Sequence, residues 1–305
     1  MLSATRITAD TATVTVVSDT KKITDWALRY FGSWWNATAV TVPVERSGSI
    51  AEGGSLLLVD VDSARLAREL IRGQLLRTGF HILHASCAVR GGRRSSPSVP
   101  RARARPRPRC CWPARASSSW PTTASEDAGL RILPWPSAAA IGFGLLDSAG
   151  LYEPLRARVL DGEQMHPTQD RRVTDALHAG STKPIWNAKG KELKPQFFPD
   201  QLSSLLHMTL ATQAHAAALL FSQVDKAAEP HVLDTPRALG KEDFFTGKTE
   251  DRYPDIFRLA PDKAAPDTDL ADRLAQLPRR ALVLNHNSHT SAELLAKTAA
   301  GLLSE

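Results

Sequence analysis

The sequence predicts an α/β fold in which short strands alternate with amphipathic helices, and we expect the sheet to be mainly parallel. Apolar or β-branched runs of strand length recur along the chain, and segments with helical spacing lie between them. Hydrophobic residues make up 42% and charged residues 23% of the composition, as in a globular protein with a buried core. The 305 residues suffice for one large domain or two modest ones.

The first part of the chain predicts three strands and one helix. Two strands are expected before the helix, at Thr11–Val17 and at Ser55–Val61. The helix should begin after Asp62 and end at Gly79. Its apolar residues recur at helical spacing: Leu66, Leu70, Ile71 and Leu75. A third strand is expected at His81–Val89, ending at the Gly91-Gly92 turn.

The last part of the chain, from Glu126 onward, returns to the same alternation. Strands are expected at Leu130–Trp135, at Ala216–Val224 as a buried strand, and at Arg280–Asn285. A helix is expected at Leu146–Leu160, and a second one after its N-cap Asp200. A short third helix should end at Leu274–Pro278, and a last helix should begin at a capping box of Thr290 and Glu293. The polar stretch from Asp170 to Lys194 predicts loops.

Arg93–Ser125 interrupts this pattern. Val99 is its one aliphatic residue larger than alanine, so the segment cannot bury enough apolar surface to offset chain entropy and should be disordered. Between Arg93 and Arg115 there are 8 arginines and no acidic residue, whereas the whole chain has a net charge of +6. The rest of the chain therefore carries 6 − 8 = −2. The basic charge belongs to this segment, and we expect it to bind polyanions non-specifically.

The position of this segment, directly after an apolar strand and a Gly-Gly turn, is where a phosphate-binding loop would lie. The genetic code offers a test. When each shifted codon takes the third base of one codon and the first two bases of the next, some shifted residues are the same whichever codons encode the segment. Cys110-Cys111 must then give Leu, and Trp112-Pro113 must give Ala. With permitted codons, Arg103–Ser125 gives G-K-T-T-T-A-L-L-L-A-R-A-G-V-E-L-L-A-N-D-R-V. We interpret Arg93–Ser125 as an out-of-frame Walker A region, with one frame slip near each end, in the gene or in its sequencing. The alternative is a genuine Arg/Pro-rich disordered loop.

The residues around this point resemble the HPr kinase/phosphorylase-like P-loop proteins, whose phosphate loop is of the phosphoenolpyruvate carboxykinase type. The resemblance rests on Leu83-His84-Ala85-Ser86, Ala88-Val89 and Gly92, which are similar to the strand that leads into that family's Walker A loop. The segment Lys194–Leu205 adds weaker support, and the specific part covers roughly His81 to Ser125. The resemblance implies a P-loop nucleotide-binding sheet flanked by helices. It also implies ATP and Mg²⁺ as cofactors and phosphoryl transfer to a protein or small-molecule hydroxyl.

The chain departs from the family at the loop itself. The positions equivalent to the lost Walker A loop hold Val99, Arg103, Ala104, Arg105 and Pro106, without glycine, lysine or threonine. Arg105 lies near the position of the loop lysine, and Thr122 and Thr123 lie near the Asn-Asp of the second strand. Because a loop of Arg-Pro repeats cannot form the backbone anion site, we expect this polypeptide to bind ATP poorly or not at all.

Other candidate sites have plainer interpretations. Gly247-Lys248-Thr249 lacks the preceding glycine of a phosphate loop, since Glu242 stands there. His84 is a weak catalytic candidate, and a hydrogen-bonded histidine at a strand end is the simpler interpretation. A polar cluster at the end of a strand is either a ligand site or a turn with a helix cap: Asn285, His286, Asn287 and His289. Two histidines without a nearby cysteine predict no metal site.

These observations combine into one expectation and one alternative. We expect an N-terminal α/β region over residues 1–80 and an HPr kinase-like P-loop domain over 81–305, with 93–125 out of frame. We expect a chain that descends from ATP-dependent phosphotransferases and is itself inactive. The sequence does not identify the acceptor of the phosphoryl group. The alternative is a non-catalytic binding protein with a disordered basic arm. Three cysteines, no signal-peptide pattern and no long apolar run predict a cytoplasmic protein without a membrane segment. The aromatic group of Phe31, Trp34 and Trp35 is expected to be core.

Overall fold

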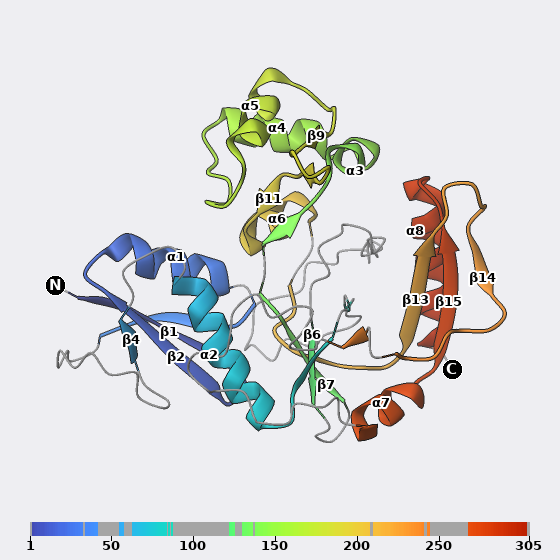
Figure 1. The fold of residues 1–305 in the computed structure, drawn as a ribbon, viewed down its shortest axis with the longest axis horizontal. Helices are drawn as coiled ribbons and strands as arrows, with labels where there is room; N and C mark the ends of the chain where they lie inside the picture. The colour runs from blue at the N-terminus through green and yellow to red at the C-terminus, as the bar shows by residue number, and fades with distance from the viewer. Residues whose placement is uncertain are drawn as a thin grey trace, which may run out of the picture.

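The computed structural model describes residues 2–32, 34–41, 55–57, 63–83, 85, 87, 122–125, 130–136, 138–207, 210–240, 243–244 and 268–303. Helices and several small sheets alternate along the chain, so the fold is broadly α/β. Figure 1 shows the N-terminal sheet at one end of the molecule and the C-terminal sheet at the other, with a helical unit above the middle. No helix in these ranges is long and apolar enough to cross a membrane.

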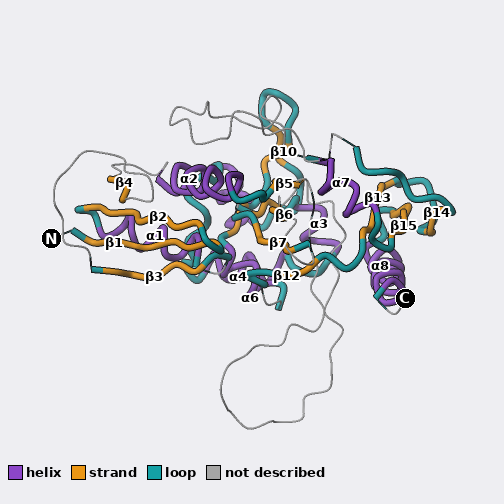
Figure 2. Tube along the Cα trace, turned by 90° about the horizontal axis from the view of Figure 1, so that it is seen from below, coloured by secondary structure: helices purple, strands orange, loops and turns teal. Residues whose placement is uncertain are grey.

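The N-terminal sheet has the strand order β3-β1-β2-β4, with β1 Ser3–Ala9, β2 Ala12–Ser18, β3 Asn36–Val40 and β4 Ser55–Leu57. β1 pairs antiparallel with both β2 and β3, and only β4 runs parallel to its neighbour. Helices α1 Lys21–Phe31 and α2 Ser63–Arg77 pack on this sheet and contact each other, so they share one face of it (Figure 2). The predicted stop of α2 is confirmed, because Gly79 has a φ of 81°.

The first hydrophobic core lies between this sheet and its two helices. Phe31, Trp34 and Trp35 are buried in it, so their prediction as core residues is confirmed. The Trp35 ring stacks on Phe31 at 5.4 Å between centroids, and its Nε1 donates to the Pro134 carbonyl oxygen at 2.9 Å. The N-terminal sheet is thereby joined to the strand that contains Pro134.

The central sheet has the order β12-β7-β6-β5, and all its pairings are antiparallel. Its strands are β5 His81–Leu83, β6 Thr122–Ser125, β7 Arg131–Pro134 and β12 Ala214–His215. β6 corrects the expectation that all of 93–125 is disordered. Residues 122–125, the last four of that segment, form a strand because their backbone groups pair on both sides, with β5 and with β7.

The helical unit over residues 138–207 contains α3 Phe143–Ser148, α4 Tyr152–Leu160, α5 Arg171–Ala179 and α6 Pro199–Leu205. Its short strands are β8 Ala139–Ala140, β9 Ile185–Trp186, β10 Glu192–Leu193 and β11 Gln196–Phe197. β11 pairs with β8, and β10 pairs with β9. These elements enclose a second core around Phe143, Leu177 and Leu202.

Three predictions for this unit were wrong in detail. The single helix expected at Leu146–Leu160 is two helices, because the chain turns at Gly150 with a φ of 67°. The loop expected after Asp170 contains α5, whose N-terminus Asp170 caps by accepting from the Arg172 backbone N–H at 3.0 Å. Asp200 is not the cap of α6, since the helix already begins at Pro199, the favoured residue at that position.

The C-terminal unit is a three-stranded sheet in the order β13-β15-β14, with α8 Ser288–Leu302 against β15. β13 Leu219–Val224 runs parallel to β15 Arg279–Leu284, and β14 His231–Leu233 runs antiparallel to it. Helix α7 Thr268–Ala275 precedes β15. β13 was expected to be buried, but its side chains are half-buried or exposed, because among the described strands it lies at the edge of its sheet.

The expectation of a mainly parallel sheet was therefore wrong. Parallel pairing occurs in two of the ladders, between β2 and β4 and between β13 and β15. The remaining ladders among the described residues are antiparallel. The architecture is a set of small mixed sheets, and these residues contain no P-loop sheet.

Candidate functional site

The predicted phosphate loop begins where β5 ends. His84, Val99, Arg103, Ala104, Arg105 and Pro106 all lie outside the described residues, as does Gly247-Lys248-Thr249. The strands on either side of the predicted loop are described, and they are neighbours. Leu83, the last residue of β5, is the cross-strand partner of Thr122, the first residue of β6. The chain therefore leaves and re-enters this sheet at one place.

The direction of this pairing bears on the predicted loop. A strand, phosphate loop, helix and strand form a crossover connection that joins parallel strands. β5 and β6 are antiparallel. In this chain the segment that follows β5 therefore does not return as the second strand of such a unit.

An arginine–aspartate pair lies beside the end of β5. Phe244 forms an isolated bridge with Leu83, and the preceding Asp243 accepts two hydrogen bonds from the Arg237 guanidinium. The Gly240 backbone N–H also donates to Asp243 Oδ2 at 2.8 Å. The Arg237 guanidinium lies 4.5 Å from the centroid of the Phe221 ring on β13. This pair ties residues 237–240 to Asp243, next to Phe244, and both carboxylate oxygens of Asp243 accept hydrogen bonds in doing so.

The polar cluster at the end of β15 forms a turn and a helix cap. Asn285 Oδ1 accepts from the Asn287 N–H at 2.9 Å, and Asn287 Oδ1 accepts from the N–H groups of His289 and Thr290 at 3.1 and 3.3 Å. Asn287 is thus the N-cap of α8, and the predicted capping box of Thr290 and Glu293 was wrong. Glu293 instead lies 3.5 Å from His289 Nδ1, and both side chains are exposed.

The same cluster lies at the carboxyl ends of two parallel strands, β13 and β15, where open α/β sheets bind ligands. Its amide side chains are nevertheless used by the turn and the cap, which favours the plainer of the two interpretations. Within the described ranges, no group of three or more His, Cys, Asp or Glu side chains is placed to hold a metal ion.

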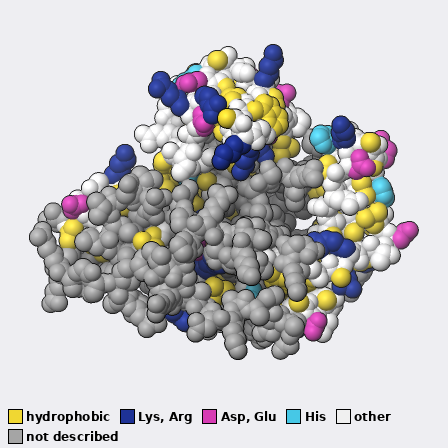
Figure 3. Space-filling model, in the orientation of Figure 1, with side chains coloured by type: hydrophobic (Ala, Val, Ile, Leu, Met, Phe, Trp, Pro, Cys, Tyr) yellow, Lys and Arg dark blue, Asp and Glu magenta, His cyan; other side chains and the backbone are white. Residues whose placement is uncertain are grey.

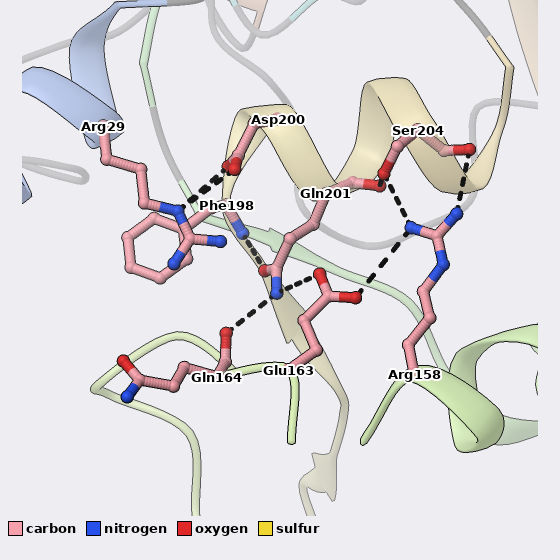
Figure 4. A network of polar contacts seen from close by, with 8 residues as sticks. All are labelled: Arg29, Arg158, Glu163, Gln164, Phe198, Asp200, Gln201 and Ser204. Atoms are coloured by element: carbon pink, nitrogen blue, oxygen red, sulfur yellow. Dashed lines mark hydrogen bonds and ion pairs between the residues drawn. The ribbon is translucent and has the colours of Figure 1, made fainter. Parts of the chain in front are cut away.

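A polar network around the buried Gln201 holds α6 to the 163–164 loop inside the helical unit (Figure 4). Gln201 is 3% exposed, and its Oε1 accepts from the Phe198 N–H at 2.8 Å. Its Nε2 donates to Glu163 Oε1 and to the Gln164 carbonyl oxygen, both at 2.8 Å. These three bonds fix the first turn of α6 on the 163–164 loop.

The neighbouring Arg29 links α1 to α6. Its Nε lies 3.1 Å from Asp200 Oδ2, and its guanidinium lies 4.1 Å from the centroid of the Phe198 ring. Phe198 also contacts the ring of His166, which is buried between it, Trp26 and Tyr30. This is the Lys194–Leu205 segment of the family resemblance, and the contacts assign it a structural role in joining two units.

Two groups at structural positions have shifted pKa values. Burial raises the pKa of the Tyr152 phenol, whose OH donates to the Ser181 carbonyl oxygen at 2.9 Å. Hydrogen bonds from Arg172, first from its side chain and then from its backbone N–H, lower the pKa of Asp170. The Tyr152 hydrogen bond joins the start of α4 to the residues that follow α5, and the Asp170 hydrogen bond caps α5. Both groups have structural roles, so neither shifted pKa indicates an acid–base site.

Sequence reasoning did not identify Arg237, Asp243 or Gln201. Arg237 and Asp243 are six residues apart in a stretch without periodicity, and the structure joins them directly by two hydrogen bonds. Arg237 also lies over the Phe221 ring of β13, and Phe244 bridges Leu83 of β5. Gln201 has a weak sequence signal, because a glutamine at the third helical position is half of a capping box. Comparison of the chain with protein-family models, curated proteins and solved structures found no match.

Proposed function

We propose that this chain belongs by descent to the HPr kinase-like ATP-dependent phosphotransferases, and that it has lost ATP binding because its Walker A region is out of frame. The observation that carries the proposal is the sequence around β5. Leu83-His84-Ala85-Ser86 precedes a segment whose shifted frame, with permitted codons, can be read as G-K-T and the second-strand Asn-Asp. The acceptor would be a protein hydroxyl or a small-molecule hydroxyl.

One structural observation supports the proposal: residues 122–125, whose codons can give Asp-Arg-Val in the shifted frame, form the strand β6, as expected for the end of the family's second strand. β6 runs antiparallel to β5, whereas the strands of a phosphate-loop unit run parallel, so this pairing does not itself support such a unit in the chain as it stands.

The residues that this chain offers do not fit Mg²⁺-ATP. Val99, Arg103, Ala104, Arg105 and Pro106 include no hydroxyl to bind Mg²⁺ and no glycine to bring backbone N–H groups close to a phosphate. Arginine side chains alone would neutralise charge without positioning the phosphates. We therefore derive no catalytic step for this polypeptide.

The experiment compares this chain with a frame-restored chain, in which the segment 93–125 is encoded in the shifted frame. Mg²⁺-ATP at about 100 times its Kd should stabilise the restored chain by about 2.7 kcal/mol. For 305 residues this corresponds to a rise in Tm of about 4 °C. Replacing the restored loop lysine by alanine should remove the rise, and the original chain should show none.

Two results would contradict the proposal. One is a restored chain whose Tm does not respond to Mg²⁺-ATP. The other is coding DNA across codons 88–130 whose shifted frame contains no G-x-x-x-x-G-K-T. In either case the arginine-rich segment is a genuine arm, and the alternative of a non-catalytic binding protein is the better one.

A further inference from the structure

The β9–β10 hairpin carries the most exposed large hydrophobic side chain among the described residues. Trp186 is 59% exposed. Ile185, its neighbour along the strand, and Leu193, the cross-strand partner of Ile185, pack against the second core, whereas Trp186 itself lies opposite Glu192. Because side chains alternate between the two faces of a strand, Trp186 points away from that core. The indole of Trp186 is therefore apolar surface that none of the cores among the described residues uses.

Lysines flank this tryptophan in the sequence. Between Lys183 and Lys194 the chain has four lysines and one glutamate. The glutamate, Glu192, lies 3.7 Å from the Lys194 ammonium. Lys183, Lys189 and Lys191 are exposed and pair with no carboxylate in the part of the chain that the structure describes. Figure 3 shows Lys and Arg side chains gathered on the surface of this helical unit. The rest of the chain outside Arg93–Arg115 has a slightly acidic balance, so this is a local basic patch.

The tip of the hairpin is held in one conformation. Asn187 Oδ1 accepts from the backbone N–H groups of Lys189 and Lys191, each at 2.9 Å. Gly190 has a φ of 69° and donates its N–H to the Asn187 carbonyl oxygen at 3.0 Å. A ligand would therefore meet a fixed backbone, and binding would cost little chain ordering.

We propose that the β9–β10 hairpin binds single-stranded nucleic acid, with the Trp186 ring stacking on a base and the three exposed lysines contacting phosphates. An exposed aromatic ring on a strand, flanked by lysines, is the combination that single-strand binding proteins use. An anionic membrane fits less well. A hairpin that enters a bilayer needs apolar residues at its tip, whereas this tip is Asn187-Ala188-Lys189-Gly190-Lys191 and the tryptophan stands to its side.

The test measures binding of the full chain to a labelled oligo(dT) and to a duplex of equal length, by fluorescence anisotropy at several salt concentrations. Trp186→Ala should weaken oligo(dT) binding about tenfold, and Trp186→Phe should retain most of it. Replacing Lys183, Lys189 and Lys191 by alanine should reduce the log–log salt slope by about 2, since each single-strand phosphate contact contributes about 0.7.

The arginine-rich segment Arg93–Arg115 requires a matched control, because it also attracts polyanions. Lys22, Lys226 and Lys297 are exposed lysines elsewhere, and replacing them by alanine removes the same charge. This control should leave the salt slope and the preference for oligo(dT) over duplex unchanged.

Three outcomes would overturn the proposal. The first is a Trp186→Ala chain that binds oligo(dT) within twofold of the parent. The second is equal loss in the two triple-lysine variants, which would assign the binding to Arg93–Arg115. The third is loss of binding to phosphatidylserine vesicles by Trp186→Ala without loss of oligo(dT) binding, which would assign the hairpin to a membrane surface.

Discussion

Substituting Gln201 by leucine should strongly destabilise the junction between α6 and the 163–164 loop. The side chain is 3% exposed, so leucine occupies nearly the same buried volume without polar atoms. The buried Phe198 N–H then loses its acceptor, which costs about 2 kcal/mol, and the bond to the Glu163 carboxylate contributes about 2 kcal/mol more. Leucine recovers part of this loss by apolar burial, so we expect a net cost of about 3 kcal/mol.

The assay is thermal unfolding combined with hydrogen exchange of residues 198–206. A cost of about 3 kcal/mol should lower Tm by about 5 °C in a chain of this length. The Phe198 amide should exchange faster, because its hydrogen bond has been removed. Gln164→Leu is the matched control: its side chain is exposed in the same loop, and we expect a change within about 0.5 kcal/mol. The network would have no role in stability if the two variants had equal Tm values and equal exchange rates.

Two further predictions concern helix caps. Asn287→Ala should destabilise the C-terminal unit by about 1 kcal/mol, measured by urea unfolding, because α8 loses the acceptor of two backbone N–H groups. Glu293→Ala should have little effect on stability. An equal loss of stability in the two variants would support the predicted capping box of Thr290 and Glu293 against a cap by Asn287 alone. Because the folded pKa of Asp170 lies below its unfolded value, its stabilisation of α5 is fully present above the unfolded pKa. It should be lost as pH falls through the lowered folded pKa. Asp170→Asn keeps a cap acceptor that does not titrate, so parallel Tm–pH curves for the two chains would refute the assignment.

The elements that could be predicted are those whose pattern is local. α2 shows helical spacing of Leu70, Ile71 and Leu75 and a glycine stop, and all of these are seen in the structure. β15 is a short apolar run that is buried throughout its second half. In both elements one sequence window contains all the information that the structure uses.

The features that were missed depend on partners distant in the sequence. Strand direction is set by how the chain returns to a sheet, so no property of β5 or β7 alone indicates that their ladders are antiparallel. α5 was taken for a loop because its first turn is Arg171-Arg172. α5 is an exception to this dependence on distant partners, because Val173, Ala176 and Leu177 recur at helical spacing between the Asp170 cap and Gly180. β1 and α1 were not predicted at all, and their core partners come from β2, α2 and β7.

The place where the 84–121 stretch leaves and re-enters the central sheet bears on whether the rest of the fold depends on the sequence of that stretch. Leu83 and Thr122 are cross-strand partners, so the sheet itself fixes both ends of the 84–121 stretch. The entropy of closing such a loop depends only weakly on its length, at about 0.6 kcal/mol per doubling. The first two cores are built from residues outside that stretch. Replacing its sequence therefore leaves their packing unchanged, whereas a phosphate site needs particular residues at particular loop positions. For this reason we expect the frame-restored chain to keep these two cores, whereas its central sheet should differ, because the restoration replaces residues 122–125 and a phosphate-loop unit joins parallel strands.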